Sequence, residues 1–217
     1  MMCRCGYYHK NSAGRPFFWS QFVSIRHFST AIQKRSDPDV CARCASLGPT
    51  CCQLVPGQEE ACFPVSTLER NRIVDVVSQR GGFTRERNSA AFVNNMARLF
   101  PGERKVIMAL FPADQFHFRL STHADGKCTF LESAGCMLPT EVRPYYCRIF
   151  PLWVVRDMLT VFTASQCLAQ KEGRTVPGVV QAIGTTEQTV RKLHGKLRLA
   201  WGLPPREGMA FVSSVKA

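Results

Sequence analysis

A run of cysteines between residues 41 and 52 constrains this chain more than any other feature. Cys41 and Cys44 are followed, after six residues, by the adjacent pair Cys51 and Cys52, so four thiols lie within twelve residues. The two-residue gap between Cys41 and Cys44 allows both thiolates to point at one ion, and Gly48 allows the chain to fold back toward it. Because tetrahedral thiolate sites require such clustered spacing, we predict a metal site rather than four small core residues.

Five further cysteines follow, each beside turn-forming or rigid sequence, a setting that suits metal ligands. We therefore predict nine metal-ligating cysteines: Cys41, Cys44, Cys51, Cys52, Cys62, Cys128, Cys136, Cys147 and Cys167. Taken singly, Cys62 and Cys167 fit equally well as small core residues. The stretch from residue 51 to residue 57 is predicted to be extended, so the two adjacent thiols would point to opposite faces. Either this pair bridges two neighbouring centres or only one of its thiols is a ligand.

Cysteine usage also bears on the cellular compartment. Eleven of the 217 residues are cysteine, far above ordinary usage, which implies disulfides, metal binding or thiol chemistry. Residues 1–36 lack the apolar core and the small-residue cleavage site of a secretory signal. The longest uninterrupted apolar stretch, residues 149–155, is much shorter than the ~20 residues of a membrane span. We therefore expect reduced thiols, a cytoplasmic location and no membrane partner.

The positive charge is concentrated near the N-terminus. The formal net charge is +12, from 28 Lys and Arg against 16 Asp and Glu. Six of these basic residues and no acid occur in residues 1–36: Arg4, Lys10, Arg15, Arg26, Lys34 and Arg35. The remainder of the chain is only mildly basic. A nucleic-acid-binding domain would instead carry basic residues interleaved with aromatic residues on its body, so nucleic acid ranks low among the expected partners.

A break at residues 36–39, Ser-Asp-Pro-Asp, separates this leader from the rest of the chain. We expect residues 1–36 to be a basic leader outside the fold and residues 37–217 to form one metal-binding domain with a C-terminal helix. The leader's Arg-rich, Ser-containing and acid-free composition also occurs in mitochondrial transit peptides, but an upstream extension or a misassigned start codon explains it better.

The remaining periodicity predicts a mixture of helices and hairpins. Capping patterns and apolar stripes indicate helices at about 66–79, 85–100 and 185–201. Alternating residues indicate one hairpin formed by 116–120 with 128–131 and another formed by 152–155 with 159–162. The expected fold class is α+β, a small single domain of helices and short β-hairpins organised around a cysteine–metal cluster.

Several separated motifs together resemble one known family. The first cysteine run is followed by Cys128-Thr129-Phe130-Leu131, by Cys136, and by an Arg-Pro-Tyr-Tyr-Cys-Arg-Ile-Phe-Pro box at residues 143–151. This pattern resembles the YkgJ-type cysteine-cluster family of zinc- or iron-chelating proteins over residues 41–151. The loop before Cys51 is longer here than in the family pattern.

The resemblance implies chelation of zinc or iron, including a [4Fe–4S] cluster, and a link to protein lysine methylation through relatives that carry this domain. A thiolate cluster is negatively charged, so nearby cations must offset its charge. Arg143 and Arg148 flank Cys147 and are the expected cations, while Tyr145 and Tyr146 are expected to shield the site from water.

Three functions remain open, in this order of preference. The first is a metal-binding protein, the second an iron–sulfur or zinc-dependent enzyme in redox chemistry or protein methylation, and the third a zinc-dependent nucleic-acid-binding module. His123, five residues before Cys128, is a weaker candidate ligand than the cysteines and fits an exposed turn better. The chain contains no phosphate-binding glycine motif and no His-Glu-x-x-His motif. The sequence identifies no catalytic residue and no protein partner.

Overall fold

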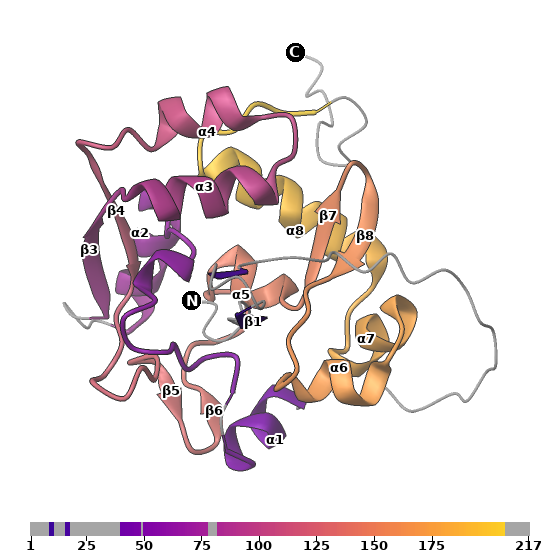
Figure 1. The fold of residues 1–217 in the computed structure, drawn as a ribbon. Coiled ribbons are helices and arrows are strands. Elements are labelled where there is room, and N and C mark those ends of the chain that lie inside the picture. Colours follow the sequence, from indigo (N-terminus) through magenta and orange to yellow (C-terminus); the bar gives the residue numbers. More distant parts are fainter. Residues whose placement is uncertain (1–8, 11–15, 18–39, 49, 78–81, 207–217) are drawn as a thin grey trace.

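The structure is a computed structural model, and it describes residues 9–10, 16–17, 40–48, 50–77 and 82–206. Short helices and two-stranded antiparallel ribbons make up this part of the chain (Figure 1). The helices are α1 Val40–Ser46, α2 Thr67–Val77, α3 Ala90–Leu99, α4 Arg104–Leu110, α5 Tyr145–Ile149, α6 Leu168–Gly173, α7 Val176–Ala182 and α8 Glu187–Ala200. The ribbons are β1 His9–Lys10 with β2 Pro16–Phe17, β3 Phe83–Arg87 with β4 Phe116–Leu120, β5 Leu131–Glu132 with β6 Gly135–Cys136, and β7 Leu152–Val155 with β8 Met158–Val161. The predicted α+β class is confirmed.

The β1–β2 ribbon falls within the predicted leader. The other residues before Val40 lie outside the described residues, so the domain boundary near residue 37 stays a prediction. No helix in the described part of the chain is long and apolar enough to cross a membrane.

Helix α2 begins where its capping signal predicts. The Ser66 hydroxyl accepts a hydrogen bond from the Glu69 amide at 3.2 Å, and the Glu69 carboxylate accepts one from the Ser66 amide at 2.9 Å. The apolar stripe predicted for this helix, formed by Leu68, Ile73, Val76 and Val77, holds only in part. Ile73 is fully buried and Val77 packs partly buried against the core, but Leu68 and Val76 are exposed. Glu69 occupies the inward face instead, because its carboxylate finds hydrogen-bond donors there.

The helix predicted at 85–100 begins later, at Ala90, because residues 83–87 form β3. Ser89 caps α3 by accepting a hydrogen bond from the Phe92 amide at 3.1 Å. The predicted pairing of 116–120 with 128–131 was also wrong. Residues 116–120 pair with β3 along their whole length. The chain beside Cys128 instead contacts residues 121–123, through the Thr122–Cys128 bridge and two flanking backbone hydrogen bonds.

Two other elements match the sequence prediction. Strands β7 and β8 form the expected hairpin, with Arg156 and Asp157 both at positive φ in its two-residue turn, at 47° and 63°. Helix α8 covers the expected range, and its apolar side chains Val190, Leu193 and Leu197 are buried.

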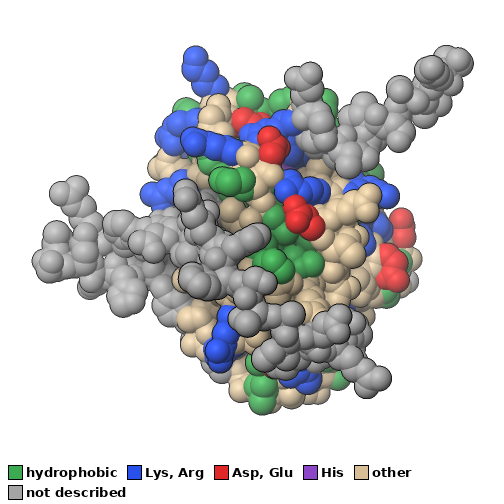
Figure 2. All heavy atoms as spheres, turned by 90° about the vertical axis from the view of Figure 1, so that its right-hand side faces the viewer, with side chains coloured by type: hydrophobic (Ala, Val, Ile, Leu, Met, Phe, Trp, Pro, Cys, Tyr) green, Lys and Arg blue, Asp and Glu red, His purple; other side chains and the backbone are tan. Residues whose placement is uncertain are grey.

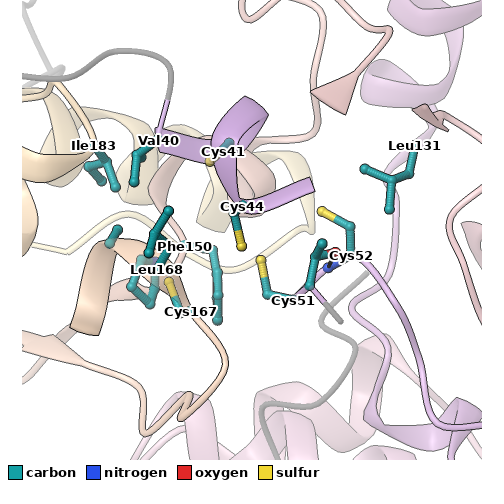
Figure 3. A pocket seen from close by; sticks show the side chains of 13 residues that line it. Val40, Cys41, Cys44, Cys51, Cys52, Leu131, Phe150, Cys167, Leu168 and Ile183 are labelled. Atoms are coloured by element: carbon teal, nitrogen blue, oxygen red, sulfur yellow. Dashed lines mark hydrogen bonds between the residues drawn. The ribbon is translucent and has the colours of Figure 1, made fainter. Parts of the chain in front are cut away.

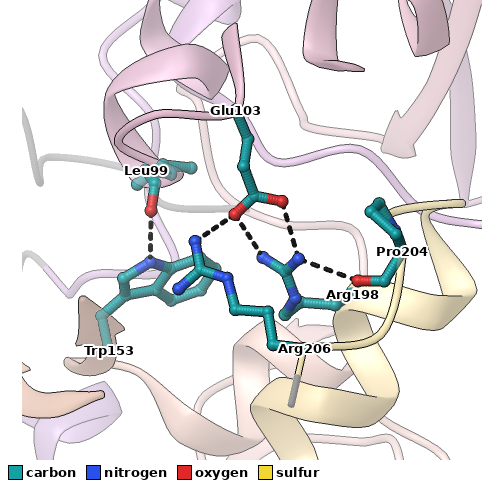
Figure 4. A network of polar contacts seen from close by, with 6 residues as sticks. All are labelled: Leu99, Glu103, Trp153, Arg198, Pro204 and Arg206. Atoms are coloured by element: carbon teal, nitrogen blue, oxygen red, sulfur yellow. Dashed lines mark hydrogen bonds and ion pairs between the residues drawn. The ribbon is translucent and has the colours of Figure 1, made fainter. Parts of the chain in front are cut away.

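An aromatic core joins the helices to the β7–β8 ribbon. Trp153 on β7 is fully buried, and its indole Nε1 donates a hydrogen bond to the Leu99 carbonyl at the end of α3, at 3.1 Å (Figure 4). Phe63 stacks on this indole with ring centroids 5.5 Å apart. Other rings around the pair are Phe100, Tyr146, Phe162, His194 and Trp201. Side chains from segments throughout the described chain therefore pack in one core.

His117 is buried in its neutral form. The Asn88 amide nitrogen donates to the Pro112 carbonyl, so the Asn88 oxygen accepts a hydrogen bond from His117 Nδ1, at 2.8 Å. Nε2 is therefore the unprotonated nitrogen, and it is buried without a hydrogen-bond partner among the described residues. Burial, aided by the charge of Arg119, lowers the pKa of His117 to about 4.

This burial predicts a loss of stability in acid. An unfolded histidine titrates near pH ~6.5, so between about pH 6.5 and pH 4 the unfolded chain binds the extra proton. The free energy of unfolding should therefore fall as the pH falls through this range, by roughly 3 kcal/mol for His117. Urea unfolding of His117→Gln at a series of pH values should show a shallower pH slope than the unaltered protein. His123→Gln, at an exposed position, should leave that slope unchanged; equal slopes in all three proteins would contradict the assignment.

Candidate metal centre

Helix α1 carries Cys41 and Cys44 and is held from two sides. The Arg43 guanidinium donates two hydrogen bonds to the Glu172 carboxylate on α6, both at 3.0 Å. On the other side, Gly135 of β6 approaches so closely that a Cβ there would lie 3.2 Å from the Ala42 Cα. The segment from Cys41 to Cys44 is therefore part of a helix that contacts α6 on one side and β6 on the other.

The adjacent pair Cys51 and Cys52 lies in a turn, which corrects the predicted extended conformation. The Gln53 amide donates to the Thr50 carbonyl at 3.1 Å, and the Cys52 amide donates to the Thr50 hydroxyl at 3.0 Å. In this turn the two thiols do not face opposite sides, because the Cys51 thiol hydrogen-bonds to that of Cys52. This contact is the main reason that the pKa of Cys52 falls to about 7 although burial opposes it; the charge of Arg143 and a hydrogen bond with Thr50 act in the same direction.

A backbone contact brings the distant Cys128 to this turn. The Cys128 amide donates to the Cys52 carbonyl at 3.0 Å, and the Leu54 amide donates to the Gly126 carbonyl at 2.7 Å. Gly126 has φ of 82°, and a Cβ on it would collide with the Leu54 carbonyl. The turn before Cys128 thus serves to join the two halves of the cysteine pattern.

Cys147 is positioned by the buried carboxylate of Glu69. Besides capping its own helix, Glu69 accepts a hydrogen bond from the Tyr145 amide at the start of α5, at 2.8 Å. Arg72 donates to the Arg143 carbonyl at 3.0 Å and to the Tyr145 hydroxyl at 3.1 Å. Helix α2 therefore fixes the Arg-Pro box in place. The capping pattern located Glu69, but no sequence signal indicated this second role.

One cavity of about 40 Å³ collects five of the predicted cysteines: Cys41, Cys44, Cys51, Cys52 and Cys167. The sulfurs of Cys44, Cys51 and Cys167 point into it from α1, from the turn and from the start of α6 (Figure 3). Most of the other lining residues are apolar, namely Val40, Leu131, Phe150, Pro151, Leu168, Ala169 and Ile183. The structure therefore brings thiols separated by more than a hundred residues to one apolar space.

The remaining cysteines divide into two groups. Cys128, Cys136 and Cys147 do not line the cavity, yet each lies close enough to Cys52 for its charge to raise their pKa values, in addition to the larger effect of burial. Cys62 is part of the hydrophobic core. His123 lies on an exposed turn.

Burial keeps most of these thiols protonated at neutral pH. Cys41 is an exposed residue, yet the protein around its thiol reduces the hydration of the thiolate; this loss, followed by the charge of Cys52, raises the pKa of Cys41 to about 12. Burial likewise raises the pKa of Cys147 to about 12 and that of Cys167 to about 11. None of the nine described cysteines forms a disulfide with another.

Arg143 supplies a positive charge at the centre of this group. Its guanidinium donates to the carbonyls of Leu138 at 2.8 Å and Cys136 at 3.3 Å, and its charge lowers the pKa of Cys41, Cys52 and Cys136. Arg148, the other expected cation, donates to the Glu141 carbonyl at 3.5 Å.

Comparison with known proteins adds no relative. No family model, curated protein or solved structure matches this chain. Among the residues that the structure describes, no three or more His, Cys, Asp or Glu side chains are arranged so as to hold a metal ion. Metal ligation and the resemblance to the YkgJ-type family therefore stay predictions from the residues.

Proposed function

We propose that this chain is a metal-binding protein in which clustered cysteine thiolates chelate zinc or an iron–sulfur cluster. The observation that supports the proposal is the cavity where Cys44, Cys51 and Cys167 direct their sulfurs to one space. Three separate segments meet there, and isolated core cysteines would have no reason to converge in this way.

The donor set suits a soft or borderline metal. Among the described residues that line the cavity, every potential side-chain ligand other than the Thr50 hydroxyl is a sulfur, and thiolates select zinc and iron–sulfur clusters over magnesium or calcium. A volume of about 40 Å³ exceeds the ~15 Å³ that one water molecule requires. Arg143 would offset part of the negative charge that thiolates acquire when they bind metal.

Metal binding has to move the sulfurs, since no three of the described side chains are arranged for ligation. Cys51 and Cys52 lie in a turn and Cys167 lies just before α6, so rotation about their Cα–Cβ bonds moves the sulfur without displacing a helix. The thiols must also lose their protons, so affinity should rise with pH.

Metal analysis of anaerobically purified protein tests the proposal. We expect at least one equivalent of zinc in colourless protein, or iron with sulfide and a visible absorption band. Reconstitution with each metal after treatment with a chelator should restore the same content. Protein that holds neither metal after anaerobic purification and reconstitution would overturn the proposal.

A further inference from the structure

One face of the β3–β4 ribbon is exposed at the end that contains Arg87 and Phe116, and reaches the core at the other end, where Leu120 is buried opposite Phe83. In its register Arg85 lies opposite Phe118 and Arg87 opposite Phe116, so these four side chains share a face. The alternate residues face α3, where His117 stacks on Phe92 with centroids 3.8 Å apart. We call the first set, together with Arg70 of α2, the outer ribbon face.

Guanidinium groups lie over phenyl rings along this face. The guanidinium of Arg85 lies 4.2 Å from the centroid of the Phe116 ring. That of Arg70 lies 4.5 Å from the centroid of the Phe118 ring. Phe116 is nevertheless 47% exposed, a large fraction for an aromatic residue in a strand. The face therefore offers aromatic surface and guanidinium N–H groups side by side.

Acidic residues are few in this ribbon. Glu86 is the only acid in either strand, and it lies on the opposite face in an ion pair with Arg119, at 3.1 Å. Arg70 and Arg85 make no ion pair with any residue that the structure describes. Elsewhere, Figure 2 shows Lys and Arg spread over the face that it displays, with acidic side chains among them.

We propose that the outer ribbon face binds single-stranded nucleic acid. Unpaired bases stack on exposed aromatic rings, and arginines beside those rings contact the phosphates; proteins without sequence preference combine these two interactions. Arginine is suited to both, because its plane stacks on a ring while its N–H edge remains available. An acidic peptide would use the charges but leave the exposed Phe116 ring without a role. This inference is independent of metal binding.

Fluorescence anisotropy with a labelled oligothymidylate of about 16 nucleotides tests the inference on the whole 217-residue chain. Phe116→Ala should weaken binding by roughly 5- to 100-fold, as expected for loss of one stacking partner, and Phe116→Trp should restore it. Arg85→Ala with Arg87→Ala should reduce the slope of log affinity against log salt by about 2. Met158→Ala, which removes a similarly exposed apolar side chain on β8, is the matched control for the ring and should have no effect.

Lys192→Ala with Lys196→Ala removes the same charge from exposed positions on α8 and is the matched control for the arginines. It should leave affinity within about twofold, because a distant pair makes no phosphate contact. Equal loss in both double variants, or unchanged binding by Phe116→Ala, would place the contact elsewhere, including the basic residues 1–36. Absence of binding at low salt would also overturn the inference. So would competition by polyglutamate that is equally strong in the unaltered protein and in Phe116→Ala, and that result would favour an acidic protein as the partner.

Discussion

Replacing Cys44 with serine should cost far more stability in the metal-loaded protein than replacing Cys3 with serine. Structural zinc sites contribute on the order of 10 kcal/mol to folding, a magnitude comparable to the whole stability of many domains. Serine is a poor metal ligand, and the Cys44 sulfur points into the thiol-lined cavity (Figure 3). Cys3 belongs to the predicted leader and lies outside the described residues.

The comparison should be made by urea unfolding with and without a chelator, alongside metal analysis. The chelator separates a ligand from a packing residue, because a packing residue costs the same in both conditions. If Cys44 is a ligand, the difference between Cys44→Ser and the unaltered protein should nearly vanish once metal has been removed from both. If Cys44→Ser and Cys3→Ser lower the free energy of unfolding of the metal-loaded protein by small and equal amounts, the proposal that clustered cysteines bind metal is contradicted.

Local signals in the sequence predicted individual elements well. Helix α2 was located by the reciprocal bonds of Ser66 and Glu69, and helix α8 by a cap at Thr186, whose hydroxyl accepts from the Thr189 amide at 3.1 Å. The β7–β8 hairpin was located by its two-residue reversal at Arg156. In each case the signal comes from residues that lie close together in the sequence. The element could therefore be predicted without knowing how distant segments pack.

Pairing across the chain could not be predicted in the same way. Strand β4 was predicted correctly but assigned the wrong partner, because β3 precedes it by some thirty residues and had been taken as the start of α3. Gly126 appeared to be a simple hairpin turn. Gly126 also approaches Leu54 closely, where the two halves of the cysteine pattern meet. The sequence alone does not indicate which distant segments of backbone come into contact.

The cysteine spacing pointed to convergence without giving its geometry. Clustering of Cys41, Cys44 and Cys51 in one cavity is consistent with the spacing argument, but Cys167 joins them only through the position of α6. The conformation of the adjacent pair depends on the Thr50 side chain, whose hydroxyl accepts a bond from the Cys52 amide. Side-chain caps of this kind compete with extended structure, and periodicity arguments do not detect them.

Replacing Glu103 with alanine should destabilise the fold by about 3–5 kcal/mol, because it leaves a buried arginine without its counter-ion. Arg198 on α8 is 1% exposed and donates two hydrogen bonds to the Glu103 carboxylate, at 2.9 and 2.7 Å (Figure 4). It also donates to the Pro204 carbonyl at 2.9 Å, and Arg206 donates to the same carboxylate. Burial would raise the pKa of Glu103, but these arginines outweigh it and lower the pKa.

The exposed pair Glu187 and Arg191 supplies the matched control. It lies on α8 at a separation of four residues, with a 2.6 Å contact, and Glu187→Ala should cost no more than about 0.5 kcal/mol in urea unfolding at neutral pH. A similarly small cost for Glu103→Ala would show that water or another group satisfies Arg198.

A double replacement separates the value of the ion pair from the cost of breaking it. Glu103→Leu with Arg198→Met removes both charges and keeps apolar volume, so it should recover most of the stability that Glu103→Ala loses. Recovery would mean that the pair contributes little net free energy and that the penalty comes from the stranded guanidinium. Failure to recover would mean that two further contacts matter, the hydrogen bond from Arg198 to the Pro204 carbonyl and the ion pair between Arg206 and Glu103. These contacts would then hold the end of α8 against the loop between α3 and α4, which apolar side chains cannot do.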